Sequence, residues 1–174
     1  MKPVQHAPTP VAYEATIKLT DDTGLLVKRE TLNLNSLIAG AVKGAAGAAG
    51  INLRMDELPL VRAYAAPMQE ALCLLLQAML AQNEACSKVY CYVQGAPAGP
   101  SLLDGHEDAG VYSVTIHTNA EGAGTDAAQH LLQEAKRLFA QNKIGLEHKC
   151  IPAGGVHFML TLYRCVQPQT EPRQ

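Results

Sequence analysis

Residues 67–85, PMQEALCLLLQAMLAQNEA, form the longest run in this sequence whose apolar side chains recur at the spacing of an α-helix. Seven of these side chains fall on one helical stripe: Met68, Ala71, Leu72, Leu75, Leu76, Met79 and Leu80. Cys73, Leu74 and Ala78 widen the stripe until most of the circumference is apolar. Because such a helix must be covered on several sides, the run predicts a central buried helix packed against a sheet and other helices. Pro67 fits its first turn, where a missing N–H loses no helical partner.

The composition favours one compact domain. Hydrophobic residues make up 48% of the 174 residues, which is enough to bury a substantial core. Both ends of the chain are polar and contain several prolines. We therefore expect a single domain over residues 12–166, between a flexible N-terminus at 1–11 and a flexible tail at 167–174.

Charge and cysteine content exclude several classes of partner. A net charge of -2 with 14 Lys and Arg residues gives no basic surface for nucleic acid. No run is long and apolar enough for a signal peptide or a membrane span, so we expect a soluble, cytoplasmic protein without membrane contact. The five cysteines form an odd set without CxxC spacing. They predict reduced thiols rather than disulfides or a zinc site.

Apolar periodicity places the other elements. Helices are predicted at 35–49, 67–85 and 126–141, the last with Asp126 and Gln129 spaced as a capping pair. Residues 95–110 are rich in glycine, proline and acidic residues, and are interpreted as a long connection. Strands are predicted at 12–19, 25–29, 51–55, 60–64, 88–93, 111–118, 146–151 and 156–166. This order predicts an α+β fold, an α/β sandwich in which a mixed sheet of about five strands carries three helices on one face.

Three short motifs follow one another between Asn33 and Tyr163: LNSLI at 34–38, PLVRA at 59–63 and EALCLLL at 70–76. In order and approximate spacing they resemble the ATPase domain of sensor histidine kinases. The closing segment IPAGGVHFMLTLY, residues 151–163, resembles the last hairpin of the same domain. The resemblance places the chain with the GHKL superfamily of ATPases and implies a histidine-kinase ATPase-like fold.

The chain departs from the family at the positions that the resemblance assigns to nucleotide binding. Helix asparagines of the family hold Mg²⁺ on the phosphates, and the matching residues here are Leu74 and Ala78. The acid that accepts the adenine amino group is replaced by Thr118, and the threonine of the last hairpin by Val156. Residues 123–125 alone stand where a long lid precedes the last helix. The resemblance therefore implies a degenerate form without catalytic residues, metal or cofactor.

A remnant of the nucleotide pocket is the one candidate binding site. Its residues are Thr118, Asn119, Glu121, Gly122, Gly154 and Gly155. Polar residues beyond a strand end are common at ligand sites, but an ordinary polar turn is the favoured interpretation of the first four. The six histidines stand at no metal-binding spacing, and His130 is expected on the solvated face of its helix.

The leading functional hypothesis is a non-catalytic signalling or scaffold module of the bacterial two-component type. Such a module has lost ATP binding and acts by binding another protein or itself. The alternative is a residual nucleotide or small-molecule binder that takes ATP or ADP. A second alternative, a small enzyme of unrelated chemistry, has no Ser-His-Asp spacing, P-loop or paired carboxylates to support it.

Overall fold

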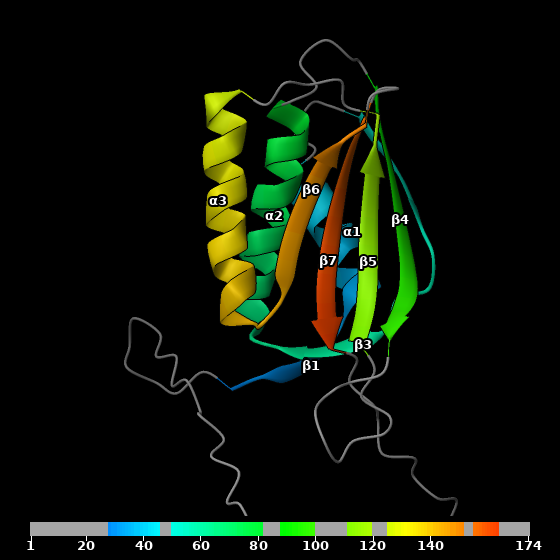
Figure 1. Cartoon of the computed structure of the whole chain (residues 1–174), viewed down its shortest axis with the longest axis vertical. Helices are drawn as coiled ribbons and strands as arrows, with labels where there is room; N and C mark the ends of the chain where they lie inside the picture. The colour runs from blue at the N-terminus through cyan, green and yellow to red at the C-terminus, as the bar shows by residue number, and fades with distance from the viewer. Residues whose placement is uncertain are drawn as a thin grey trace, which may run out of the picture.

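The computed structural model describes residues 28–45, 50–81, 88–99, 111–119, 125–151 and 155–163. Within these residues, three helices lie on one face of a mixed five-stranded sheet (Figure 1). The helices are α1 (Leu34–Ala45), α2 (Ala65–Ala81) and α3 (Asp126–Gln141). The strands are β1 (Glu30–Asn33), β2 (Gly50–Met55), β3 (Leu60–Ala63), β4 (Lys88–Gly99), β5 (Val111–Thr118), β6 (Gly145–Cys150) and β7 (Val156–Tyr163). The predicted fold class is confirmed. The ends predicted to be flexible, 1–11 and 167–174, lie outside the described residues.

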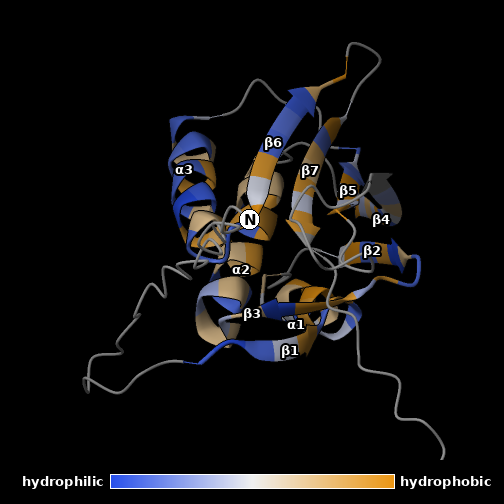
Figure 2. Ribbon diagram, turned by 60° about the horizontal axis from the view of Figure 1, so that its bottom comes forward, coloured by the Kyte–Doolittle hydropathy of each residue, from blue (hydrophilic) through white to orange (hydrophobic). Residues whose placement is uncertain are grey.

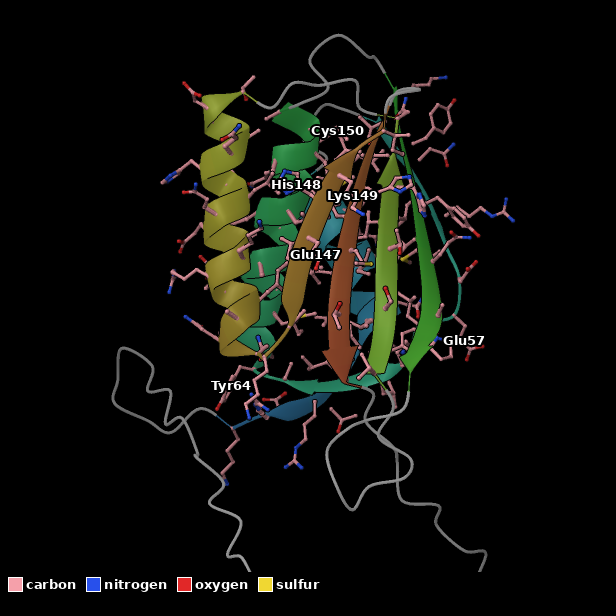
Figure 3. The ribbon with its side chains drawn as sticks, viewed as in Figure 1. Glu57, Tyr64, Glu147, His148, Lys149 and Cys150 are labelled. Carbon is pink, nitrogen blue, oxygen red and sulfur yellow. The ribbon has the colours of Figure 1, made fainter. Side chains whose placement is uncertain are left out.

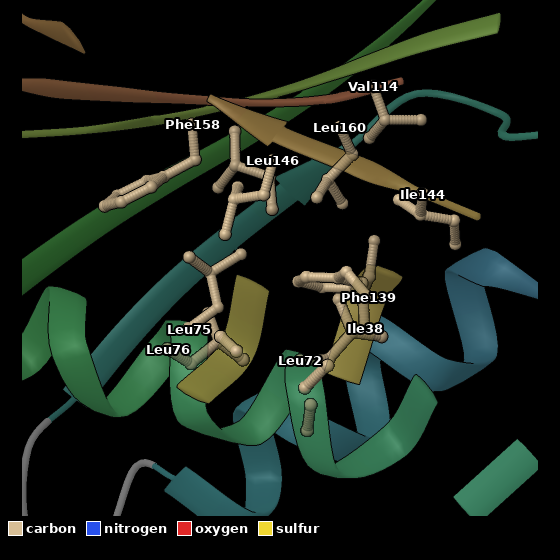
Figure 4. Packing of buried hydrophobic residues seen from close by; sticks show 14 of the residues in the cluster. Ile38, Leu72, Leu75, Leu76, Val114, Phe139, Ile144, Leu146, Phe158 and Leu160 are labelled. Carbon is tan, nitrogen blue, oxygen red and sulfur yellow. The ribbon is translucent and has the colours of Figure 1, made fainter. Parts of the chain in front are cut away.

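The sheet has the strand order β2-β4-β5-β7-β6. β2 runs parallel to β4, and every other neighbouring pair is antiparallel. Because successive side chains of a strand point to opposite faces, alternate residues of the inner strands pack against the helices. These buried residues are Val89, Cys91, Val93, Val114, Ile116, Phe158, Leu160 and Leu162. In Figure 4, Phe158, Leu146 and Leu160 of the sheet point toward Leu75 and Leu72 of α2.

α2 is the central helix, as predicted. It packs against α1 on one side and α3 on the other, and its inner face covers the sheet. Six of the seven residues of the predicted stripe are buried, and Leu80 is half-buried. Figure 2 shows α2 mostly in hydrophobic colours, whereas α3 carries hydrophilic residues on its outer side. Pro67 lies in the first turn of α2.

Two asparagines fix the start of α1: Asn33 caps the helix, and Asn35 binds the turn between β2 and β3. Asn33 caps the helix, because its Oδ1 accepts a hydrogen bond of 3.0 Å from the Ser36 N–H. The Asn35 side chain donates to the Asp56 carbonyl at 2.8 Å and accepts from the Leu58 N–H at 2.9 Å. These bonds hold the turn between β2 and β3 against α1. They satisfy backbone groups that no strand pairs.

One N-terminal strand was not predicted, and the predicted N-terminal hairpin lies mostly outside the described residues. β1 was not predicted, and it pairs with β3 as a separate two-stranded antiparallel sheet. Its sequence, ETLN, is too short to show an alternating pattern. The predicted hairpin over 12–29 lies outside the described residues except for Lys28 and Arg29, and neither of these is in a strand.

β4 is longer than predicted, because the strand continues through the glycine- and proline-containing residues 94–99. Gly95 and Pro97 pair with Val114 and Tyr112 of β5, with a register shift between Pro97 and Gly99. The pairing of β2 with β4 ends with Met55 opposite Val93. Within the described residues, positions 94–99 of β4 therefore have no strand partner on the β2 side. An open edge tolerates a proline, which cannot donate a ladder hydrogen bond.

A side chain other than the predicted pair caps the start of α3, and backbone hydrogen bonds close its end. Thr125, not Asp126 with Gln129, caps the helix: its Oγ1 accepts from the Ala128 N–H at 3.2 Å. The N-cap is therefore Thr125, one residue before the predicted pair of Asp126 and Gln129. The C-terminus closes with bonds from the Lys143 and Ile144 N–H groups to the last turn, and Lys143 has a φ of 59°.

Asn142, directly after α3, connects two distant parts of the core. It is 5% exposed, and its Oδ1 accepts a 2.7 Å hydrogen bond from the Tyr64 N–H, 78 residues away in sequence. Figure 3 shows Tyr64 beside the C-terminal end of α3.

Asn142→Ala is expected to lower the free energy of unfolding by about 1 to 3 kcal/mol, because a buried hydrogen bond is lost. Equilibrium urea unfolding measures the change. Gln133→Ala, on the exposed side of α3, is the control and should change stability by less than about 0.5 kcal/mol. Equal effects of the two variants would contradict the role of Asn142.

Candidate functional site

The predicted pocket residues that the structure describes lie at one end of the sheet. Thr118 is the last residue of β5 and is 6% exposed, and it pairs with Val156 of β7 and Cys91 of β4. Gly155 comes directly before β7, with a φ of +104°. A Cβ atom at Gly155 would lie 2.5 Å from the Thr118 carbonyl oxygen. The structure therefore brings Thr118 and Gly155 into close backbone contact.

Asn119 follows Thr118 and uses its side chain to extend the pairing of β5 with β4. Its Oδ1 accepts from the Tyr90 N–H at 2.8 Å, and its Nδ2 donates to the Lys88 carbonyl at 3.4 Å. The amide thus binds the backbone of β4 as a further strand residue would. Glu121, Gly122 and Gly154 lie outside the described residues.

The two helix positions that matched the metal-binding asparagines are apolar and packed. Ala78 is fully buried in the core, and Leu74 is half-buried against it. Val156, at the position of the hairpin threonine, is also buried. Among the described residues, no group of three or more His, Cys, Asp or Glu side chains could hold a metal ion. The side chains of Leu74 and Ala78 themselves offer no oxygen ligand to a hard cation such as Mg²⁺.

A second polar cluster lies on the sheet face opposite the helices, and it was not predicted. His117 of β5 and His157 of β7 are paired in register, and their Nδ1 and Nε2 atoms are 2.7 Å apart. The two rings meet edge to face, with centroids 4.0 Å apart. Burial, and secondly the charge of His157, lower the pKa of His117. The two histidines are 40 residues apart in sequence. Only the register of two separately predicted strands could have indicated the pair.

Comparison with known proteins identifies the fold. No protein-family model and no curated protein matches this sequence. The mycobacterial sensor histidine kinase MprB superposes with a TM-score of 0.59 at 11% sequence identity, over 78% of this chain and 97% of that chain. The ATP-binding domain of PrrB from Mycobacterium tuberculosis gives 0.56 at 13% identity, over 80% and 99%. The cytoplasmic segment of the histidine kinase QseC gives 0.56 at 12% identity, over 84% and 85%.

These similarities show that the chain has the fold of the ATPase domains of sensor histidine kinases, as the sequence motifs implied. In the part of the chain that is described, no helix is long and apolar enough to cross a membrane.

Proposed function

We propose that this chain is a non-catalytic signalling or scaffold module with a histidine-kinase ATPase-like fold, which has lost ATP binding and acts by binding another protein or itself. The observation that carries the proposal is the short connection between β5 and α3, residues 119–125. In the family that the sequence resembles, a lid with a glycine-rich phosphate loop occupies this place. Too few residues remain here to form one.

The apolar residues of α2 support the same conclusion. A triphosphate carries several negative charges, and these need Mg²⁺ or N–H donors in the site to offset the loss of water. Leu74 and Ala78 provide neither an oxygen ligand nor a donor. Each lost charge-assisted hydrogen bond costs roughly 1.5 to 3 kcal/mol, so losses at the metal, the adenine acceptor and the lid together weaken binding by several powers of ten.

The described pocket residues already have structural roles. The Asn119 amide binds the Tyr90 and Lys88 backbone, and Thr118 lies buried against Gly155. Neither supplies a carboxylate for the adenine amino group. The alternative is a residual nucleotide or small-molecule site around Asn119, Glu121 and Gly122.

A thermal-shift series with ATP and ADP, with and without Mg²⁺, tests the loss of binding. Stabilisation by a ligand equals RT ln(1 + [L]/Kd), so a ligand far below its Kd leaves the melting temperature unchanged. We expect millimolar Mg·ATP to raise the melting temperature by less than about 1 °C.

The ATP-binding domain of PrrB is the matched control for that series and should show a rise under the same conditions. A saturable rise of several degrees in this chain, abolished by Glu121→Ala, would favour the alternative. Sedimentation velocity over a range of concentrations separates the two forms of the proposal, since self-association makes the weight-average sedimentation coefficient rise with concentration.

A further inference from the structure

A row of polar side chains crosses the outer face of the sheet, the face opposite α1, α2 and α3. Strand register places Arg54, Tyr92, His117, His157 and Lys149 opposite one another on β2, β4, β5, β7 and β6. Within this row the Arg54 guanidinium lies 5.5 Å from the centre of the Tyr92 ring, which stacks beside His117. Figure 3 labels Lys149 on β6, beside β7. The two histidines occupy the middle of the row.

Hydrogen bonds fix which nitrogen of His117 carries the hydrogen. The Asp56 carboxylate only accepts, so the Tyr92 hydroxyl donates to it at 3.2 Å. The Gln94 amide N–H then donates to the Tyr92 oxygen at 3.2 Å. Gln94 Oε1 is left to accept from His117 Nε2–H at 3.1 Å. This leaves His117 Nδ1 as a lone pair, which accepts the Nε2–H of His157.

We propose that His117 Nδ1 and His157 Nε2 form a two-imidazole binding site for a divalent transition-metal ion such as Zn²⁺. Imidazole is a preferred ligand of these ions, and two Zn–N bonds of about 2.0 to 2.1 Å at a tetrahedral angle separate the nitrogens by about 3.3 Å. The present separation of 2.7 Å needs a small rotation of the rings to reach that value. His157 frees its Nε2 by moving its hydrogen to Nδ1, so both rings stay neutral. Water completes the coordination, because both histidines are partly exposed.

The surroundings of the pair support a metal ligand role for His117. Metal-binding histidines usually donate their second N–H to an oxygen acceptor, which fixes the ring and raises its basicity. Gln94 Oε1 does this for His117, and the chain of bonds continues to the Asp56 carboxylate. An anion would find no free N–H at the pair, because each Nε2–H is already donated.

The charged residues near the pair have opposing effects. Lys149, opposite His157, and Arg54, above Tyr92, disfavour a cation. Asp56 and Glu147 carry the opposite charge on the neighbouring row. Because Lys149 is exposed, its side chain can extend into solvent. Its effect on affinity distinguishes a cation from an anion as the ligand.

Zn²⁺ alone, titrated as the chloride into the full chain, is the probe. Long-range ¹H–¹⁵N spectra of the histidine rings and calorimetry of the same samples give the site and the affinity. The Cys150→Ser background removes a thiol that is exposed in the described part of the chain. We expect saturable shifts of His117 Nδ1 and His157 Nε2, and a loss of affinity of at least about tenfold in either His117→Ala or His157→Ala.

Three further variants complete the test. Gln94→Leu should lower the affinity by about tenfold while leaving both ligands in place. His148→Ala, on the exposed part of β6 and stacked on Phe158 rather than His157, is the matched control and should leave affinity unchanged. Lys149→Met should keep or raise Zn²⁺ affinity.

The proposal is overturned if Zn²⁺ gives no saturable shift at the two rings, if both alanine variants bind as the wild type does, or if Lys149→Met weakens binding. Circular dichroism melts of each variant confirm that it is folded.

Discussion

Leu75→Ala is expected to lower the free energy of unfolding by about 2 to 5 kcal/mol. The Leu75 side chain is 0% exposed and points from α2 toward the sheet, between the two layers (Figure 4). Truncation removes buried methyl and methylene groups and leaves a cavity. Since the surrounding strands are fixed by pairing on both sides, they can close that cavity only in part.

Equilibrium unfolding in urea measures this change, with Leu74→Ala as the matched control. Leu74 has the same side chain and the same helix but is only half-buried, so its truncation should cost clearly less. A loss of less than about 0.5 kcal/mol for Leu75→Ala would show that α2 is not the centre of the core.

Gly155→Ala is expected to destabilise the fold by at least about 1 to 3 kcal/mol. A φ of +104° is strained for any residue with a Cβ atom, and that strain alone is of this order. The new Cβ would also lie 2.5 Å from the Thr118 carbonyl oxygen, a backbone atom of a paired strand that cannot move away cheaply. The variant therefore tests the close contact between the two predicted pocket residues.

Gly44→Ala is the control with the opposite expected sign. Gly44 lies in α1, and an added Cβ meets no atom within 4 Å. Alanine there should stabilise the protein by up to about 1 kcal/mol, because helical glycine costs more backbone entropy. Urea unfolding that gave the same sign for both variants would contradict the backbone geometry at Gly155.

The main elements could be predicted because their sequence patterns are strong. The apolar stripe of α2 and the alternation of β5 and β7 each repeat over several turns or residue pairs, so chance matches are rare. Short or irregular elements could not be predicted in this way. β1 has four residues, and the end of β4 contains a proline that is tolerated only because β2 stops at Met55.

The candidate site could be predicted only in part. Thr118 and Gly155 were named from motif positions, and strand pairing places them together. The role of Asn119 depends on its distance from the β4 backbone, which the sequence does not contain. The His117 and His157 pair depends on the register between two strands, and a shift of one residue would put the histidines on opposite faces.

Titration of the ¹⁵N-labelled chain with Mg·ATP, followed by the backbone amides of Thr118, Asn119 and Gly155, tests the central claim most directly. The spectra report binding at the end of the sheet that carries these three residues, whether or not it changes stability. The account predicts that these amides do not shift in a saturable way at millimolar Mg·ATP. Saturable shifts centred on these three residues, with a Kd below the millimolar range, would contradict the loss of nucleotide binding.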